Sequence, residues 1–600
     1  MQQPTLGPLD RRTLLAHLAL LGAAPTALSL LSSCQSSTSH RTPPASGRQP
    51  SPTTFRNGAV AADHGIASEI GIEILRAGGN AVDAAIAVNA ALGVVRPYSC
   101  GLGGGGFMVM YVEKSGEAWA MNARETAPPG VWETYFQDLR SAGGPEEASR
   151  YGGHAIAVPG TPSGLFLAHR THGSLPMDRL LAPAARVARE GFEADANYLN
   201  AVASLRATRK RLPWTKTISD WTWDQLCKRG DVKEGTRIEN PALANTLEKL
   251  GRDGIAAWRR GDIPRSLARV ARYSGGKLTA QAISGYRAHA CAPLIIEDAF
   301  AGETLVSMGL PSSGGITIAQ IKGMLNVVLR EAGYPPLDSP EAAHALLEAM
   351  KIAFAQRAKY LADPAFAPVP VQELLDRDRI EALSLDIQPA RARSAEEIST
   401  ATQLPEDSGT SHFSVIDKDR TAVAWTSTIN GTFGSLVGDP QSGVVLNNEM
   451  DDFTTISGEG NLFELRQSDW NLPEPGKHPL SSMSPTIVVD DDGKIRAIAG
   501  ASGGPRIISA TLQVLLGIRY EGLTAEEAVQ RPRLHHQWMP DAVRHEARTD
   551  QGALQQQLQE RGHTFEEGNR GIAVVQAIRV EEDGFEPASD PRKGGTASGY

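Results

Sequence analysis

Isoleucines recur at every fourth position near the start of the folded region, which places them on one face of a helix. They are Ile66, Ile70 and Ile74. Gly78-Gly79 predicts the end of this helix. Asn80, with Asp83 three residues later, predicts the capped start of the next one.

A longer helix is predicted to begin at Ser339-Pro340 and to end before Pro364. One side of it carries the large apolar side chains Leu346, Leu347, Met350, Phe354 and Leu361. Such a stripe predicts a helix that packs against the core.

A polar stretch over residues 394–409 predicts an exposed loop that runs into two strands, Thr410–Ile416 and Thr421–Ile429. Asp417–Arg420 between them has the composition of a hairpin turn. The main division of the chain is therefore predicted at Gly409/Thr410.

Pairing these strands across a four-residue turn places Thr410 opposite Ser427. Thr428 is then a near neighbour of Thr410, and Asn430 points to the same face while the strand lasts. The hairpin alone thus brings together two hydroxyls and an amide.

Composition indicates a soluble globular protein with a sizeable core. The 600 residues are 41% hydrophobic and 21% charged, which excludes coiled-coil, collagen-like and polytopic membrane classes. The net charge is -9, without long runs of one sign. Nucleic acid is therefore not an expected partner.

Residues 1–34 are typical of an export signal. Arg11-Arg12 precedes an apolar run over residues 14–31, and Leu31–Cys34 resembles a bacterial lipobox in which Cys34 would be lipidated. Residues 35–57 predict a flexible linker. An uncleaved hydrophobic anchor is the alternative. Both predict an exported protein, periplasmic or in the cell envelope, that meets the membrane only through its N-terminus.

The remaining cysteines, Cys100, Cys227 and Cys291, allow one disulfide at most. No cysteine and histidine cluster has zinc spacing, and His535-His536 with His545 lacks the helical i, i+4 arrangement of a metal pair. We therefore expect no metal site and interpret these histidines as structural.

Two glycine motifs have competing interpretations. Gly101–Gly106 matches the dinucleotide pattern G-x-G-x-x-G, but a strand, Phe107–Val112, follows it instead of a helix. Close backbone packing is the better interpretation. Gly500–Gly504 matches G-x-S-x-G between a predicted strand and a predicted helix, as in a serine hydrolase that uses Ser502.

That hydrolase would also need Asp541 and either His545 or His563. Alternatively, the glycine turn supplies free backbone N–H groups to a different nucleophile.

Ten short segments, in order along the chain, resemble the γ-glutamyltransferase family. They are Gly78–Ala85, Gly103–Phe107, Arg124–Pro128, Pro311–Gly315, Thr410–Asp417, Thr426–Asn430, Asn447–Phe453, Pro479–Thr486, Gly503-Gly504 and Gly594–Tyr600. The resemblance covers nearly everything after residue 57.

The resemblance implies an N-terminal nucleophile hydrolase, an α/β protein with a four-layer αββα sandwich. Such enzymes activate a threonine hydroxyl with the α-amine of the same residue, which an internal Thr410 lacks. The implied solution is self-cleavage after Gly409. It gives a large chain, residues 58–409, and a small chain, residues 410–600, that form a heterodimer.

The resemblance also implies the chemistry, with no cofactor. Thr410 attacks the γ-carbonyl of a γ-glutamyl amide such as glutathione, and water or an amino acid or peptide acceptor resolves the ester. Thr428 orients the nucleophile, and the N–H groups of Gly503 and Gly504 hold the oxyanion.

Substrate binding is implied at both charges of the glutamyl group. The resemblance implies that the α-carboxylate is bound by Arg124, Ser481 and Ser482. It implies that the α-ammonium is bound by Asn430, Glu449 and Asp452. Asp452 favours true γ-glutamyl substrates, because relatives that act on acyl groups without that amine tend to lose this acid. His412 is interpreted as structural.

Residues 453–480 correspond to a lid, with Phe463 where some bacterial relatives have tyrosine. Three alternatives stay open: an acylase or amidase of the same fold, the Ser502 hydrolase, and a non-catalytic binding lipoprotein.

Overall fold

The computed structural model describes residues 54–300, 302–398, 409–462, 465, 467–546, 551–568 and 571–600. The predicted export signal, Cys34 and most of the predicted linker lie outside these ranges, as does Phe463. None of the helices within the ranges has both the length and the apolar composition needed to cross a bilayer.

The helices predicted from hydrophobic spacing are confirmed. Helix α1 (Gly65–Arg76) buries two of the three isoleucines, and α2 (Ala81–Val95) begins with a reciprocal capping box between Asn80 and Asp83. Helix α13 (Pro340–Tyr360) begins at Ser339, whose hydroxyl accepts the N–H of Ala342.

Two antiparallel sheets form the centre of the fold. The seven-stranded sheet has the order β17-β1-β9-β10-β2-β3-β6, and the six-stranded sheet has the order β16-β15-β12-β11-β8-β7. The strands of the first sheet are β1 (Gly58–Ala62), β2 (Gly105–Val112), β3 (Glu117–Asn122), β6 (His289–Cys291), β9 (Gly409–Asp417), β10 (Thr421–Asn430) and β17 (Thr596–Gly599). Those of the second are β7 (Leu294–Phe300), β8 (Glu303–Ser307), β11 (Thr486–Val489), β12 (Ile495–Ser502), β15 (Val574–Val580) and β16 (Phe585–Ser589).

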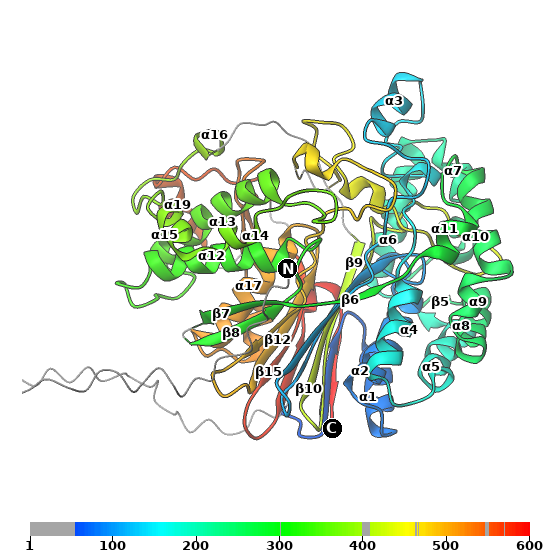
Figure 1. The fold of residues 1–600 in the computed structure, drawn as a ribbon, viewed down its shortest axis with the longest axis horizontal. Helices are drawn as coiled ribbons and strands as arrows, with labels where there is room; N and C mark the ends of the chain where they lie inside the picture. Colours follow the sequence, from blue (N-terminus) through cyan, green and yellow to red (C-terminus); the bar gives the residue numbers. More distant parts are fainter. Residues whose placement is uncertain are drawn as a thin grey trace, which may run out of the picture. The chain divides into compact units, whose positions relative to one another are not determined.

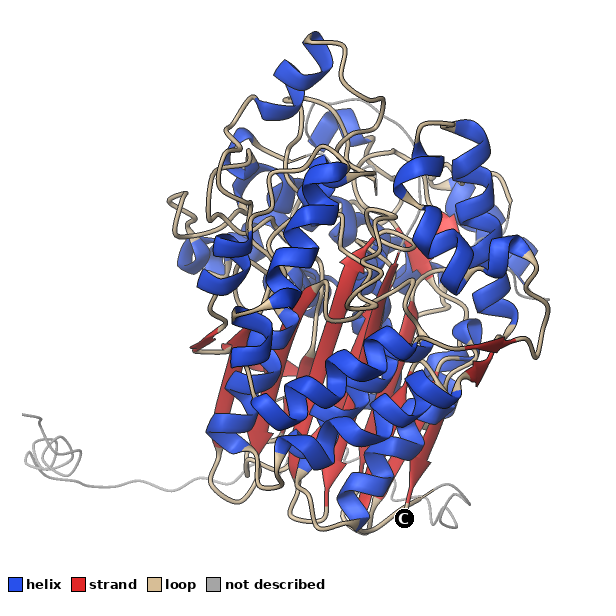
Figure 2. Ribbon diagram, turned by 90° about the vertical axis from the view of Figure 1, so that its right-hand side faces the viewer, coloured by secondary structure: helices blue, strands red, loops and turns tan. Residues whose placement is uncertain are grey.

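Helices cover the outer face of each sheet (Figures 1 and 2). On the seven-stranded side lie α1, α2, α4 (Thr161–His172), α5 (Met177–Glu190) and α8 (Pro241–Asp253); on the other side lie α12 (Gly314–Val328), α13 and α17 (Arg506–Arg519). Apolar residues of β1, β2, β9 and β10 meet those of β11, β12 and β15 in one buried cluster between the sheets. The predicted four-layer αββα sandwich is therefore confirmed.

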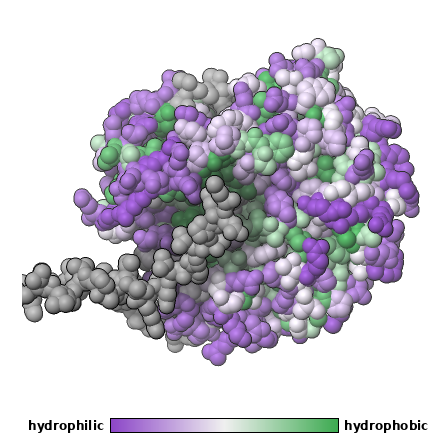
Figure 3. Space-filling model, viewed as in Figure 1, coloured by the Kyte–Doolittle hydropathy of each residue, from purple (hydrophilic) through white to green (hydrophobic). Residues whose placement is uncertain are grey.

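Shorter elements complete the described ranges. The helices are α3 (Tyr135–Ser141), α6 (Ala196–Arg211), α7 (Thr215–Ile218), α9 (Ala256–Arg259), α10 (Asp262–Tyr273), α11 (Ala280–Gly285), α14 (Val371–Leu374), α15 (Arg377–Ser384), α16 (Ala395–Ile398), α18 (Ala525–Gln530) and α19 (Gln551–Glu560). The strands are β4 (Phe192–Glu193), β5 (Arg237–Ile238), β13 (Leu534–His535) and β14 (Arg544–His545). On the face drawn in Figure 3 most side chains are hydrophilic, and hydrophobic ones gather in a hollow near its middle.

Segments on both sides of the predicted division at Gly409/Thr410 contribute strands to the same two sheets. Strand β9, which begins there, pairs with β1 on one side and β10 on the other, and β11 pairs with β8 in the second sheet. Each sheet therefore contains strands from before and from after residue 409.

The register of the β9–β10 hairpin differs by one residue from the prediction. Ile416 pairs with Ala422, because the Asp417 carboxylate accepts the N–H groups of Asp419 and Thr421 and lengthens the turn. As a result Thr410 lies directly opposite Thr428 and not opposite Ser427.

The glycine run before β2 is confirmed as a site of close packing. A Cβ at Gly104 would lie 1.9 Å from the carbonyl oxygen of Thr428, and one at Gly103 would lie 2.0 Å from that of Val445. A side chain at Gly104 would push this backbone away from β10, and one at Gly103 would push it away from Val445.

Gly104→Ala is expected to destabilise the protein by about 3 kcal/mol or more, because backbone atoms cannot move aside as a flexible side chain can. Thermal unfolding measures this effect. Gly552→Ala in α19 is the matched control, since a Cβ there meets nothing within 4 Å. Equal melting temperatures for the two variants would contradict the close-packing argument.

Candidate active site

Thr410 and Thr428 form a pair of hydrogen-bonded hydroxyls at one end of the β9–β10 ladder. Their Oγ1 atoms are 3.1 Å apart, and Thr428 Oγ1 donates to the carbonyl oxygen of Gly409 at 3.0 Å. The N–H of Asn430 donates to Thr428 Oγ1 at 2.8 Å. Thr428 Oγ1 donates its own proton to the Gly409 carbonyl and accepts one from the Asn430 N–H. One lone pair of this oxygen therefore remains to accept a hydrogen bond from the Thr410 hydroxyl.

The Gly503-Gly504 turn lies beside this pair, between β12 and α17. The φ angles of Gly503 and Gly504 are positive, 137° and 60°, and residues that carry a side chain rarely adopt such values. Gly503 lines one cavity together with Thr410, and Gly504 lines a second one with it. The strand, turn and helix of the G-x-S-x-G motif are thus present, next to Thr410.

The two cavities meet at Thr410. The Arg124 cavity is lined by the predicted residues Arg124, Thr410, Thr428, Asn430, Asp452, Ser481, Ser482 and Gly504. The Lys593 cavity is lined by Thr410, Ser502, Gly503, Arg506, Arg592 and Lys593, among others. The residues singled out in the sequence therefore converge from distant segments.

Arg124 is paired with the two acids, Glu449 and Asp452, that the family resemblance assigns to the opposite substrate charge. Its guanidinium bonds Glu449 Oε2 at 2.7 Å and Asp452 Oδ2 at 2.5 Å. Glu449 and Asp452 lie in one short turn, η4 (Glu449–Asp452), which brings both carboxylates to the same side. The predicted cationic and anionic halves of the site therefore pair with one another.

Burial governs the protonation of this cluster. It opposes the charge on Arg124, but Glu449 and Asp452 outweigh it and raise the pKa of Arg124. Burial also raises the pKa of Glu449 and of Asp452, although Arg124 works against both shifts. Glu125, 3.7 Å from Arg124, has its pKa raised by burial to about 8.

Arg357 is a site residue that sequence reasoning missed. It is 1% exposed, lines the Arg124 cavity, and donates to Ser313 Oγ at 2.9 Å and to Ser482 Oγ at 3.2 Å. Its Nη1 atom has no partner among the described residues, and burial lowers its pKa to about 10. The sequence did indicate that Arg357 is buried, because it follows Phe354 by three residues and so lies on the apolar side of α13.

Residues of the predicted lid hold Asp452 in place. Its backbone carbonyl accepts from the side-chain amides of Gln467 and Asn471, and Asn461 Nδ2 lies 3.4 Å from Asp452 Oδ1. Leu465 lines the Arg124 cavity. The lid segment therefore contributes directly to this side of the site.

The remaining predicted polar residues have backbone partners. Asn430 Nδ2 donates to the carbonyl of Asn448, and Ser481 Oγ accepts the N–H of Met483. These bonds fix where the two side chains sit at the cavity wall.

The partners that a Ser502 hydrolase would need are engaged elsewhere. Asp541 accepts the N–H of Ala395 and pairs with His536, and His563 bonds His344 at 2.8 Å. The ring of His545 packs on Phe565. The motif contributes its glycine turn to Thr410 instead.

His412 is buried inside the sandwich, where its ring contacts the hydroxyls of Thr426 and Ser414. Burial lowers its pKa to about 3, so the ring is neutral at physiological pH. In the same part of the chain that the structure describes, no group of three or more His, Cys, Asp or Glu side chains is arranged to hold a metal. Cys100, Cys227 and Cys291 are free thiols.

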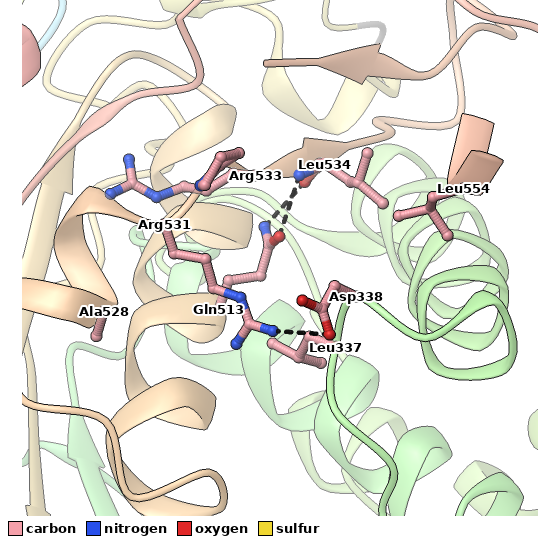
Figure 4. Close-up of a pocket in the computed structure, with 9 residues that line it drawn as sticks. Leu337, Asp338, Gln513, Ala528, Arg531, Arg533, Leu534 and Leu554 are labelled. Atoms are coloured by element: carbon pink, nitrogen blue, oxygen red, sulfur yellow. Dashed lines mark hydrogen bonds and ion pairs between the residues drawn. The ribbon is translucent and has the colours of Figure 1, made fainter. Parts of the chain in front are cut away.

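A separate hollow involves none of the predicted site residues (Figure 4). Arg531 pairs across it with Asp338 at 3.4 Å, and Gln513 exchanges two hydrogen bonds with the backbone of Leu534. The ion pair joins the end of α18 to the segment before α13, and the two hydrogen bonds join α17 to β13. We interpret this hollow as structural.

Comparison with known proteins gives one consistent family. The model of a family described as gamma-glutamyltranspeptidase matches residues 67–600. The chain is 37% identical over 549 residues to the glutathione hydrolase proenzyme of Escherichia coli (strain K12), a match that covers 90% of this chain and 91% of that protein.

Solved structures agree. The cephalosporin acylase from Bacillus halodurans superposes with a TM-score of 0.79 at 24% identity, covering 92% of this chain and 99% of that one, a likeness of fold. A gamma-glutamyltranspeptidase from Pseudomonas nitroreducens, complexed with L-DON, gives a TM-score of 0.51 at 33% identity over 58% of this chain and 99% of that one.

Glu125→Gln is expected to remove a pH-dependent loss of stability. A carboxyl whose pKa is raised by folding stabilises the protein fully below its unfolded pKa, and this contribution is lost as pH rises through about 8. The melting temperature of the variant relative to the wild type should therefore increase between pH 5 and pH 8.5. Exposed Glu69→Gln serves as the control, and a difference that stays flat with pH would contradict the assignment.

Proposed function

The chain belongs to the gamma-glutamyltranspeptidase family, and we propose that it is a self-processing γ-glutamyltransferase and glutathione hydrolase whose nucleophile is Thr410. The observation that carries the proposal is the contact between the Thr410 and Thr428 hydroxyls beside the Gly409 carbonyl. One arrangement serves two reactions, cleavage of the chain and cleavage of the substrate.

Self-cleavage begins with attack of Thr410 Oγ1 on the Gly409 carbonyl carbon. Thr428, which donates to that carbonyl oxygen at 3.0 Å, polarises it and supports the negative charge that develops. The C–N bond to Thr410 then breaks, its nitrogen takes up the hydroxyl proton, and an ester joins Gly409 to Thr410 Oγ1. Water hydrolyses the ester and leaves a Gly409 carboxylate, a free hydroxyl and a free α-amine.

That α-amine completes the catalytic group. It takes the proton of Thr410 Oγ1 as the oxygen attacks the γ-carbonyl of the donor, and the proton passes to the departing amine. The γ-glutamyl ester is resolved by water or by an acceptor amine in the reverse sense. Backbone N–H groups at Gly503 and Gly504 hold the oxyanion in both halves of the reaction.

Substrate recognition follows from the charges of the Arg124 cavity. A γ-glutamyl group carries one carboxylate and one ammonium, and it would take over the two ends of the existing Arg124–Asp452 pair. The carboxylate binds Arg124 with Ser481 and Ser482, and the ammonium binds Asp452, Glu449 and Asn430. Arg357 adds a second buried cation beside Ser482.

Export and lipidation at Cys34 stay part of the proposal. An extracytoplasmic site would expose the enzyme to γ-glutamyl compounds outside the cytoplasm. The residues concerned lie outside the described ranges.

Thr410→Ala is expected to abolish both chain cleavage and activity, since it removes the attacking oxygen. Intact mass and N-terminal sequencing should give two chains for the wild type, the smaller beginning Thr-Ser-His-Phe, and one chain for the variant. Thr428→Ala should slow cleavage by about 100-fold, the typical cost of one lost oxyanion donor. A wild-type protein that stays a single chain would reject the mechanism.

Asp452→Asn is expected to lower kcat/KM for a γ-glutamyl anilide by about 10- to 100-fold, because one charge-assisted bond to the ammonium is lost. The loss should be much smaller for the glutaryl anilide, which has no ammonium. Exposed Asp492→Asn is the control for a general effect of charge. Equal losses on both substrates would favour an acylase with another specificity.

A further inference from the structure

We propose that Lys593 and Asp63 act as positioning residues that set the proton affinity of the Thr410 α-amine. The inference rests on the proposed function, because the amine exists only after cleavage. Lys593 keeps the amine neutral, and hence able to accept a proton, near neutral pH.

Lys593 bridges the nucleophile and a buried acid. Its Nζ donates to the backbone carbonyl oxygen of Thr410 at 2.6 Å and pairs with Asp63 Oδ2 at 2.7 Å; Ser411 Oγ lies 3.5 Å away. The Lys593 side chain is 11% exposed and that of Asp63 is not exposed at all. Cleavage leaves these contacts in place, since it breaks the bond on the other side of Thr410.

Asp63 and the backbone of Lys593 are held by the surrounding structure. Gln576 Nε2, on β15, donates to Asp63 Oδ1 at 2.7 Å. Arg96, which follows α2, donates to the backbone carbonyls of both Asp63 and Lys593. Four segments of the chain thus fix one ammonium against Thr410.

The distance is short enough for a direct electrostatic effect. The carbonyl oxygen and the nitrogen of one residue are about 3 to 3.6 Å apart, so Lys593 Nζ lies within about 6 Å of the Thr410 nitrogen. A like charge at that range disfavours a second ammonium and lowers the pKa of the amine, whose ordinary value is about 7.7–8.0. Asp63 acts in the opposite sense.

Other charged groups also face Thr410 from both cavities. They are Arg124, Arg357, Asp452 and, bonded to Arg124, Glu449 on one side, and Arg506 and Arg592 on the other. Arg592 is bonded to Glu546 and Asp590. Burial raises the pKa of Cys100 to about 12 and raises that of Tyr98, so both are neutral at the pH of interest. Lys593 differs from all of these because it touches the residue that carries the amine.

Substitutions of Lys593 and of Asp63 should shift the pKa of the Thr410 α-amine in opposite directions. A purely structural role of the pair would not produce opposite shifts. In the pH profile of kcat/KM for a γ-glutamyl anilide, the acidic limb reports the pKa of the free enzyme's base. Lys593→Met should move that limb to higher pH by about one unit, because the amine gains a proton more readily. Asp63→Asn should move it to lower pH, because the positive charge is left uncompensated. Lys593→Arg keeps the charge and should leave the limb within about 0.3 unit.

Each variant is assayed as processed protein, with a small chain beginning at Thr410 verified by mass. Limbs that coincide with the wild type in Lys593→Met and Asp63→Asn, or that move in the same direction, would overturn the inference. If Lys593→Met does not mature, Asp63→Asn against Lys593→Arg decides, because an unmoved limb in Asp63→Asn overturns it equally. An uncleaved wild type would instead reject the proposed function, so the two failures are distinguishable.

Discussion

The hydrogen bond between the Thr410 and Thr428 hydroxyls depends on the register of one strand pair. A slip of one residue along β9 would turn Thr410 to the other face of the sheet and remove it from both cavities. Three features hold the register: the Asp417 carboxylate in the turn, β1 on the outer side of β9, and Gly104, whose missing Cβ lets the backbone approach the Thr428 carbonyl. The contact between the two hydroxyls therefore depends on how the backbone packs around β9 and β10.

The second constraint is charge in a closed space. Arg124, Glu449 and Asp452 are removed from water, and burying a charge is unfavourable unless a partner is at hand. In the structure they serve as partners for one another. A zwitterionic ligand can replace these internal pairs without changing the net charge of the cavity, whereas a ligand that lacks one of the two charges would leave one residue unpaired.

Local patterns in the sequence predicted the main helices and the β9–β10 hairpin with Thr410, Thr428 and Asn430, whereas the resemblance to the family supplied the other predicted site residues. The differences have identifiable causes. Capping residues, hydrophobic spacing and the turn between β9 and β10 depend on neighbours in the sequence, so they could be read directly. The hairpin register was wrong by one residue, since it depends on a side chain bonding backbone inside the turn. The sequence did not predict the roles of Arg357 and of the Lys593–Asp63 pair. Arg357 bonds a residue more than 40 positions away in the chain, and Lys593 and Asp63 are more than 500 positions apart.

The mixing of strands from both sides of residue 409 in each sheet has a consequence for the lifetime of the protein. The proposed cut after Gly409 would leave neither polypeptide with a complete sheet, because β9 pairs with β1 and β8 pairs with β11. Reassembly from separated chains then becomes a bimolecular event and loses the high effective concentration that a single covalent chain provides. The proposed maturation would thus make folding a step that each molecule completes only once, and the height of the unfolding barrier, not an equilibrium, would then govern its survival.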